Sequence, residues 1–346
     1  MRNAGFVLQV SLGILTLASG CSRKVEDSVT LHTTVDQEIS APILSGFHRA
    51  ENKRIQPTAT FAAVDGDRKE LLKALRLDDT SDVFWTDDLW LMMDLQQQGV
   101  LASHPWKVSA DFPPDMRSAD GSWCGFGAIA RVLIVNNEKL LDPNERPQSV
   151  AELRDSRWKQ RCAIARPTMG TAAIHAAIIA DQQGDAAGQW FADVAANAVV
   201  LPSDSAVAAA VAAGRVDWGL TDSNYAVAYQ DQSAPITIIF PDQQTDQPGT
   251  VRIPQAVAVW QHAPHPVAAA RLADYLLEPS TEDRLAMSDA AQIPISSLST
   301  YKPRVLPTSP VRWAAPDFVS AHQAWSEWGP RLQEIFAPPA SAAPRD

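Results

Sequence analysis

Four short polar segments follow apolar, strand-like runs, and each stands in front of a pattern typical of a helix. They are HTTVDQE (32–38), WTDD (85–88), RPTMGT (166–171) and TDSNY (221–225). In an open α/β sheet the turns after the strands face the crevice where ligands bind. Exposed N–H groups at the helix starts favour an anionic or acceptor-rich ligand. Helix caps use the same residue types, but four such turns in both halves of the chain predict a ligand site.

Sequence motifs of the common enzyme classes are missing from the chain. There is no GxxxxGK[ST] phosphate loop, GxSxG elbow, HExxH, Cys-x-x-Cys or G-x-G-x-x-G behind a strand. The seven histidines are scattered, and His32 and His175 lie inside apolar patterns, where a hydrogen-bonded core imidazole is more common than a base or a ligand. An enzyme built from dispersed residues stays open as an alternative, with carboxylates near the turns as acid and base.

The composition favours a folded protein that binds neither nucleic acid nor acidic surfaces. The chain has 346 residues, of which 46% are hydrophobic, which is enough for two domains with sizeable cores. Its 29 Lys and Arg against 40 Asp and Glu give a net charge of −11, which opposes attraction to nucleic acid and anionic lipid. A single basic residue inside a cleft would still hold a small anion, because local donors decide that contact.

The N-terminus has the features of an export signal. Arg2 precedes the apolar run 4–18, which is too short to span a bilayer comfortably, and ASGC places Cys21 where cleavage is expected. ASGC resembles a bacterial lipoprotein signal. That resemblance implies a signal peptide over 1–20, a lipid anchor at Cys21 and a tether over 21–28. An ordinary secretory signal with a chance Cys is the alternative, and export follows in both cases.

Strand-like runs alternate with helical patterns along most of the chain, which predicts α/β layers with parallel strands. Three strand–helix units are expected in the first hundred residues. A C-terminal helix is expected to hold Trp313, Trp325 and Trp328. Cys124 and Cys162, the two cysteines of the folded part, are predicted either to pair as a disulfide or to be buried free thiols.

Local signals mark several helix starts and the end of the folded chain. Thr34 and Gln37 fit a capping box for the first helix, and Ser149 and Glu152 fit another. The last segment, 337–346, has the composition of a disordered tail.

Seven segments occur in an order that matches a known family. They are TLHTTVDQE, DVFWTDD, ARVLIVNNEKL, SVAELRDSRWKQRCAIARPTMGTAA, AAGRVDWGLTDSNYA, VRIPQAVAVWQHAPHPVAAARLADYLL and AAQIPISS. Their order resembles the solute-binding proteins of ABC importers, specifically the ferric-iron-binding family, from about Val29 to Ser297. The resemblance implies a type 2 periplasmic binding protein, with two α/β lobes that close on a solute. Lobe 1 would comprise 29–131 and 252–298, and lobe 2 would comprise 132–251 and 299–336.

The resemblance assigns an anion site to lobe 2. The family's anion-holding arginine matches Arg131, whose guanidinium would grip a carboxylate, carbonate or phosphonate group. The alternative is a surface arginine that pairs with Asp or Glu near the hinge. Thr168, Gly170 and Thr171 match the family's polar turn, where backbone N–H groups and hydroxyls meet the same anion. A simple helix cap is the alternative for these three residues.

The resemblance implies an incomplete set of iron ligands. Members of the family use two adjacent tyrosines, and this chain has Asn224 and Tyr225 at those positions. Asp36 stands where a histidine is expected, and Asp87 or Asp88 matches the acidic position. Asp36, Asp87 and Tyr225 would be hard oxygen ligands suited to Fe(III). Asp36 and Asp87 also suit the first turn of a helix without any ligand, and Asn224 slightly favours an organic anion over iron.

These observations predict an extracytoplasmic solute receptor of an ABC importer. Its expected ligand is ferric iron with an accompanying anion, or a small anionic organic solute; the candidate contacts also include Thr34 and Asp222 from the polar turns. We expect no cofactor, a permease partner, a monomer, and a periplasmic or cell-surface location through the lipid anchor. The alternatives are an exported receptor for a signalling partner and a lipoprotein hydrolase.

Overall fold

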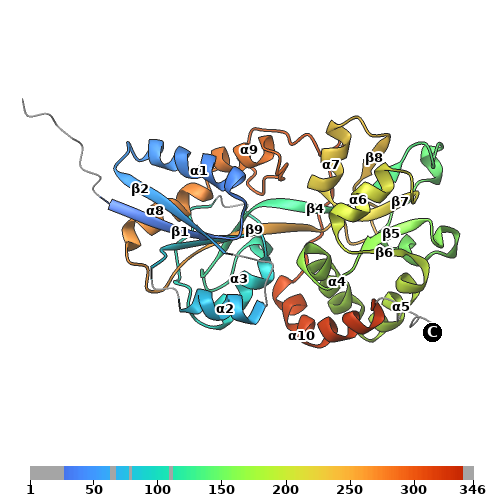
Figure 1. Cartoon of the computed structure of the whole chain (residues 1–346), viewed down its shortest axis with the longest axis horizontal. Coiled ribbons are helices and arrows are strands. Elements are labelled where there is room, and N and C mark those ends of the chain that lie inside the picture. The colour runs from blue at the N-terminus through green and yellow to red at the C-terminus, as the bar shows by residue number, and fades with distance from the viewer. Residues whose placement is uncertain (1–26, 63–67, 78–79, 109–111, 338–346) are drawn as a thin grey trace, which may run out of the picture.

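One mixed sheet runs through both halves of the protein (Figure 1). The computed structural model describes residues 27–62, 68–77, 80–108 and 112–337. Within these residues the sheet has nine strands in the order β2-β1-β3-β9-β4-β7-β5-β6, and β8 pairs with β4. Cys21 and the rest of the segment 1–26 lie outside the described residues, as does the tail 338–346.

The strands are β1 (Asp27–Thr33), β2 (Ile55–Phe61), β3 (Val83–Thr86), β4 (Cys124–Asn136), β5 (Cys162–Ala165), β6 (Val199–Leu201), β7 (Trp218–Asp222), β8 (Ile236–Ile239) and β9 (Arg252–Val259). The α-helices are α1 (Gln37–Ala50), α2 (Arg68–Arg76), α3 (Leu89–Gln97), α4 (Gly170–Gln183), α5 (Ala187–Asn197), α6 (Asp204–Ala212), α7 (Ser223–Asp231), α8 (Pro266–Leu276), α9 (Pro279–Met287) and α10 (Phe318–Ile335). The three strand–helix units expected in the first hundred residues are β1–α1, β2–α2 and β3–α3.

Two groups of parallel strands define two lobes. In lobe 1, β1 pairs with β2 and β3 in parallel. In lobe 2, β5 pairs with β6 and β7 in parallel. Because the carboxyl ends of parallel strands meet at one edge, the turn after β1 lies beside the turn after β3, and the turn after β5 lies beside the turn after β7.

Strands β4 and β9 connect the lobes and run antiparallel to their neighbours. Residues 124–130 of β4 pair with β9 in lobe 1, and residues 131–135 pair with β7 in lobe 2. Strand β9 lies between β3 and β4, so the chain returns to lobe 1 after it has completed the lobe 2 sheet. The prediction of parallel strands is therefore right within each lobe and wrong for the two strands that connect them.

A bulge in β4 lies just before the strand leaves lobe 1. The register with β9 shifts between Phe126 and Ala128, and Gly127 has a φ of 47°. A Cβ atom at this position would lie 2.2 Å from Oε1 of Gln292. The left-handed backbone favours glycine here, and a larger residue would also make the Gln292 side chain move.

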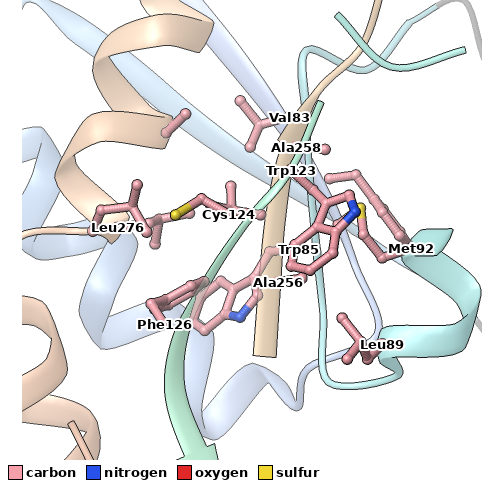
Figure 2. Packing of buried hydrophobic residues seen from close by; sticks show 14 of the residues in the cluster. Val83, Trp85, Leu89, Met92, Trp123, Cys124, Phe126, Ala256, Ala258 and Leu276 are labelled. Atoms are coloured by element: carbon pink, nitrogen blue, oxygen red, sulfur yellow. The ribbon is translucent and has the colours of Figure 1, made fainter. Parts of the chain in front are cut away.

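Aromatic side chains from several strands fill the core of lobe 1 (Figure 2). Trp85 on β3 and Phe126 on β4 are fully buried, with ring centroids 5.4 Å apart. The indole N–H of Trp85 donates to Oε1 of Gln255 at 2.8 Å, which satisfies its polar atom. This packing fixes the ends of β1 and β3, where the lobe 1 turns begin.

The C-terminal helix α10 contacts both lobes. It packs on α4 and α5 of lobe 2 and also reaches α3 of lobe 1 (Figure 1). On the lobe 1 side, His322 Nε2 lies 3.0 Å from Oδ1 of Asp94. On the lobe 2 side, the hydroxyl of Ser320 donates to Asp181 at 2.5 Å. Trp325 lies in this helix as predicted, but Trp313 precedes it, because the helix begins at Phe318 after an Asp317 cap.

The predicted capping boxes have different outcomes. Ser149 and Glu152 form theirs, on a short 3₁₀ helix. The Thr34 box is wrong: α1 has Asp36 as its N-cap residue, and the Thr34 hydroxyl bonds instead to Thr86 at the end of β3 and to Asp87 just after it.

Cys124 and Cys162 are buried free thiols on β4 and β5. Burial raises the pKa of each thiol to about 12. None of the described helices is both long enough and apolar enough to cross a membrane.

Candidate functional site

The lobe 1 half of the candidate site is built where β1 and β3 end. The Thr34 hydroxyl donates to Oδ1 of Asp87 at 2.8 Å and lies 2.8 Å from the Thr86 hydroxyl. The backbone N–H of Thr34 also donates to the carbonyl of Trp85. Thr34 therefore ties the first polar turn to the second and orients the Asp87 carboxylate.

The three lobe 1 carboxylates have different local roles. Asp88 caps α3, because its side chain accepts a hydrogen bond from the N–H of Leu91 at 3.1 Å. Asp36 is the N-cap residue of α1 but makes no side-chain cap bond, and its side chain is exposed. Asp87 precedes the cap of α3 and is also accessible to water.

Asp87 is accessible yet crowded by the surrounding protein. The pKa of its carboxyl group is raised, first by burial and then by the charges of Asp88 and Asp36, against the lowering effect of the Thr34 hydrogen bond. The lobe 1 turns thus present clustered negative charge that a cation would relieve.

The lobe 2 half is built around Arg131, which lies at the point where β4 enters lobe 2. Its Nη1 donates to Oδ1 of Asp204 at 2.9 Å, to Oδ1 of Asp222 at 2.5 Å and to the Thr171 hydroxyl at 3.2 Å. The Thr171 hydroxyl in turn donates to Oδ2 of Asp222 at 2.6 Å. The Arg131 side chain is only 2% exposed, so it is a buried paired cation rather than a surface arginine.

Burial and ion pairing shift the pKa of Arg131 in opposite directions. Burial alone would lower the pKa of Arg131, but the charges and hydrogen bonds of Asp204 and Asp222 outweigh it, and the net shift is upward. The pKa of Asp204 rises to about 7, because burial and the charge of Asp222 exceed the lowering effect of Arg131.

Asp204 is the site residue that sequence reasoning missed. It is the first residue of α6, directly after the Ser203 cap, and α6 follows β6. The segment PSDS (202–205) is therefore a fifth polar turn between a strand and a helix. The signal that selected the other four turns would also have selected this one.

Tyr225 lies in the first turn of α7, and the fold brings charges from both lobes to it. Its side chain is 40% exposed. Its pKa is raised first by burial, then by Asp222 and Asp204 of lobe 2 and by Asp87 and Asp36 of lobe 1. Four carboxylates from four turns, Asp36, Asp87, Asp204 and Asp222, therefore raise the pKa of one phenol group.

The remaining predicted residues, Asn224, Thr168 and Gly170, differ in their local contacts. Asn224 is partly buried, and its Oδ1 has no hydrogen-bond partner among the described residues. The N–H of Thr168 donates to the carbonyl of Arg166 within the turn. Gly170 begins α4 with a φ of 60°, which favours glycine.

A metal-binding cluster made of His, Cys, Asp and Glu alone does not occur in the described part of the chain, where no group of three or more is arranged to hold an ion. In the candidate site the two exposed carboxylates, Asp36 and Asp87, belong to lobe 1, and the phenol of Tyr225 belongs to lobe 2. A metal bound by these residues would have to bridge the lobes.

Two lobes connected by β4 and β9, with polar strand-to-helix turns in each lobe, define a type 2 periplasmic binding protein. Solved structures share this fold. The Bordetella ferric binding protein superposes with a TM-score of 0.76 at 21% identity, covering 89% of this chain and 99% of that one. A Trichodesmium protein solved in complex with iron and citrate gives a TM-score of 0.72 at 20% identity, covering 90% and 99%.

Residues 78–322 match the family described as bacterial extracellular solute-binding protein, and this chain belongs to that family. Among curated proteins, Iron uptake protein A2 of Synechocystis is 24% identical over 62% of this chain and 65% of the relative. An Fe(3+)-binding periplasmic protein of Serratia marcescens is 29% identical over 40% of this chain and 41% of the relative. The chain thus matches just under two thirds of the length of the first of these relatives.

Proposed function

We propose that this chain is an extracytoplasmic receptor that captures ferric iron and delivers it to the permease of an ABC importer. The observation that carries the proposal is the position of Tyr225 in the first turn of α7, where the charges of carboxylates from both lobes raise the pKa of its phenol. Carboxylate and phenolate oxygens are hard ligands that suit Fe(III). Relatives named for iron uptake and Fe(3+) binding support the same ligand.

Negative charge in the site favours a cation over the organic anion that Asn224 suggested. Asp36, Asp87 and Asp88 in lobe 1 would repel an anion, and Arg131 in lobe 2 is already paired with two carboxylates. The proposed metal ligands are Asp36, Asp87 and Tyr225. The proposal includes no catalytic step and no resident cofactor, since iron is the cargo.

The test replaces Tyr225 by Phe, with Tyr229→Phe as the matched control from the same helix. If the Tyr225 phenolate binds Fe(III), the loaded protein has a visible charge-transfer band, and Tyr225→Phe abolishes it while Tyr229→Phe retains it. Because iron must displace the phenolic proton, iron affinity is expected to rise with pH in the parent and less steeply in Tyr225→Phe. A colourless iron complex, or equal spectra in both variants, would remove Tyr225 from the ligand set.

The proposed location is the outer face of a membrane, with Cys21 as the lipid anchor. A single acyl chain binds membranes only marginally, at about 0.8 kcal/mol per buried CH₂, so stable attachment needs more than one chain. Cys21→Ser is therefore expected to move the protein into the soluble fraction of fractionated cells. Salt-resistant membrane attachment of that variant would contradict the anchor.

A further inference from the structure

His175 is a buried side chain with an unused hydrogen-bonding atom. It lies on α4 and is 5% exposed, and its Nδ1 has no hydrogen-bond partner among the described residues. The sequence predicted a hydrogen-bonded core imidazole, so the unpaired atom is unexpected. Burial, and then the charge of Arg131, lowers the pKa of His175 to about 3, so the imidazole is neutral at pH 7. Buried polar atoms rarely stay unpaired in native proteins, and an unpaired one indicates a water molecule or a ligand beside it.

His175 lines an open cavity of about 320 Å³ in lobe 2. One wall is a single face of α4, because His175, Ile179 and Gln182 follow one another at helical spacing of three or four residues. Trp190 of α5, which packs beside α4, and the loop 246–249 form other parts of the wall (Figure 1). Small-molecule sites in proteins have volumes of about 300–1,000 Å³, so this cavity has room for a small organic molecule.

The lining of the cavity favours positive charge in a ligand. None of its described lining residues is a lysine or an arginine. Asp246 contributes an exposed carboxylate, and the buried carboxylate of Asp242 accepts a hydrogen bond from the Ser149 hydroxyl at 2.5 Å. Helix α4 ends at Gln183, which also lines the cavity, with no basic residue in its last turn. The negative end of the helix dipole is therefore uncompensated by the helix itself and attracts a cation.

The same lining suits an organic cation better than a metal ion. The described part of the chain holds no group of three or more His, Cys, Asp or Glu residues arranged around an ion. Ile178, Ile179 and Trp190 line the cavity beside the polar groups. Aliphatic side chains pack on a carbon chain, and the face of an indole ring attracts an ammonium group. A short carbon chain with amine groups matches both parts of this wall.

The cavity is separate from the candidate iron site. Helix α4 begins at Gly170 in the polar turn after β5, and Gln182 lies more than three turns further along, or about 18 Å at about 1.5 Å per residue. None of the proposed iron ligands is among the lining residues. The cavity instead reaches Val251, whose carbonyl accepts a hydrogen bond from the N–H of Arg131 at 2.9 Å. A ligand here would contact the segment through which the chain returns to lobe 1.

We propose that this cavity is a second ligand site, which binds a small organic cation with one or two primary amine groups. The N–H groups of the ligand donate to the Asp246 carboxylate and to Nδ1 of His175, which accepts in the neutral imidazole. The carbon chain packs on Ile179 and Trp190. The proposal goes beyond the proposed function and does not depend on iron.

The first experiment compares three probes that each have four carbon atoms and differ in charge. Calorimetric titration of the full-length protein uses 1,4-diaminobutane, 1,4-butanediol and succinate. The diamine is expected to bind with one molecule per chain, and the diol at least about tenfold more weakly, because its hydrogen bonds carry no charge. Succinate is expected not to bind. A diamine that fails to bind at millimolar concentration, or succinate that binds equally well, would overturn the proposal.

Two substitutions locate the diamine. Gln182→Lys changes an exposed helix residue and places a competing ammonium group in the cavity, and Asp246→Asn removes the exposed carboxylate. Each is expected to weaken diamine binding at least about tenfold, since each removes a favourable charged contact. Gln189→Lys is the matched control, because it adds the same charge to an exposed position of α5 outside the lining. Equal affinities in all three variants would refute the location.

A final comparison separates this cavity from the candidate iron site, whose carboxylates also attract cations. Asp87→Asn is expected to bind the diamine as tightly as the parent does, and a loss in this variant would place the amine between the lobes and overturn the proposal. Nitrogen NMR of the imidazole supplies a direct readout. The Nδ1 resonance of His175 is expected to shift with the diamine in the parent and in Asp87→Asn, but not in Gln182→Lys. A saturated parent with an unmoved His175 resonance would equally reject the site.

Discussion

Replacement of Arg131 by Met should destabilise the protein far more than loss of an ordinary ion pair. Met has similar length and no charge, so the change removes the partner of two buried carboxylates with little change in volume. Leaving a buried charge uncompensated in this way costs about 3–5 kcal/mol. At about 2 °C per kcal/mol for a chain of this size, the Tm should fall by roughly 6–10 °C.

The loss of stability in Arg131→Met should be larger at pH 8 than at pH 5. The folded-state pKa of Asp204 is raised from 3.8 to about 7. The folded state therefore holds this proton more tightly than the unfolded state, and the resulting stability is present at low pH and lost as pH rises towards 7. Without Arg131 the pKa of Asp204 moves further upward, since the guanidinium group lowers it in the parent. The variant should therefore lose more stability than the parent between pH 5 and pH 8.

The assay is thermal and urea unfolding at pH 5 and pH 8, with Arg161→Met as the control. Arg161 pairs with Asp217 at 2.6 Å in the same lobe, but its side chain is 50% exposed. Loss of this pair should cost at most about 1 kcal/mol. Equal losses in the two variants at pH 8, or a larger loss for Arg131→Met at pH 5, would refute the buried-charge account of the cluster.

Two further expectations concern backbone and thiols. Gly170→Ala should cost about 1–2 kcal/mol in urea unfolding, because φ is 60° while a Cβ atom there would meet nothing within 4 Å. Gly188→Ala, inside α5 and without positive φ, should be neutral or stabilising, and the reverse order would contradict this reasoning. In a Cys21→Ser background, Cys124 and Cys162 should resist a thiol reagent at pH 8 until urea is added, because both are buried with pKa values near 12. Rapid labelling of the folded protein would show that one of them is accessible.

Strand-to-helix turns were the part of the site that sequence could predict. Apolar runs followed by Thr, Asp, Asn and Gly predict both the elements and the edge of the sheet that they share, so Thr34, Asp87, Asp222 and Tyr225 lie at turns as expected. The hydrogen-bond partners of these side chains could not be predicted, because they depend on which residues the fold brings close together. The Thr34 hydroxyl bonds to Asp87, 53 positions away, rather than capping its own helix.

The partners of Arg131 also could not be predicted from the sequence. Sequence identifies an arginine in a buried strand, but its neighbours Asp204 and Asp222 lie 73 and 91 positions away. An arginine that binds an external anion and an arginine that is paired with carboxylates of its own chain have the same local sequence. Only the pairing of β4 with β7 and the placement of α6 distinguish them.

The position of β9 between β3 and β4 has a consequence for the order in which the chain assembles. The lobe 1 sheet lacks β9, the strand that joins β3 to β4, until residue 259 is available, whereas the strands of lobe 2 lie between residues 131 and 239. The lobe 2 sheet can therefore form from one continuous stretch, on which α10 packs later, whereas the lobe 1 sheet needs a strand that is more than 160 residues from its partner β3. Contacts of such long sequence separation slow folding. For a chain that crosses a membrane before it folds, the late arrival of β9 would keep the lobe 1 strands unfolded, and so able to pass through a translocation channel, until most of the chain has crossed.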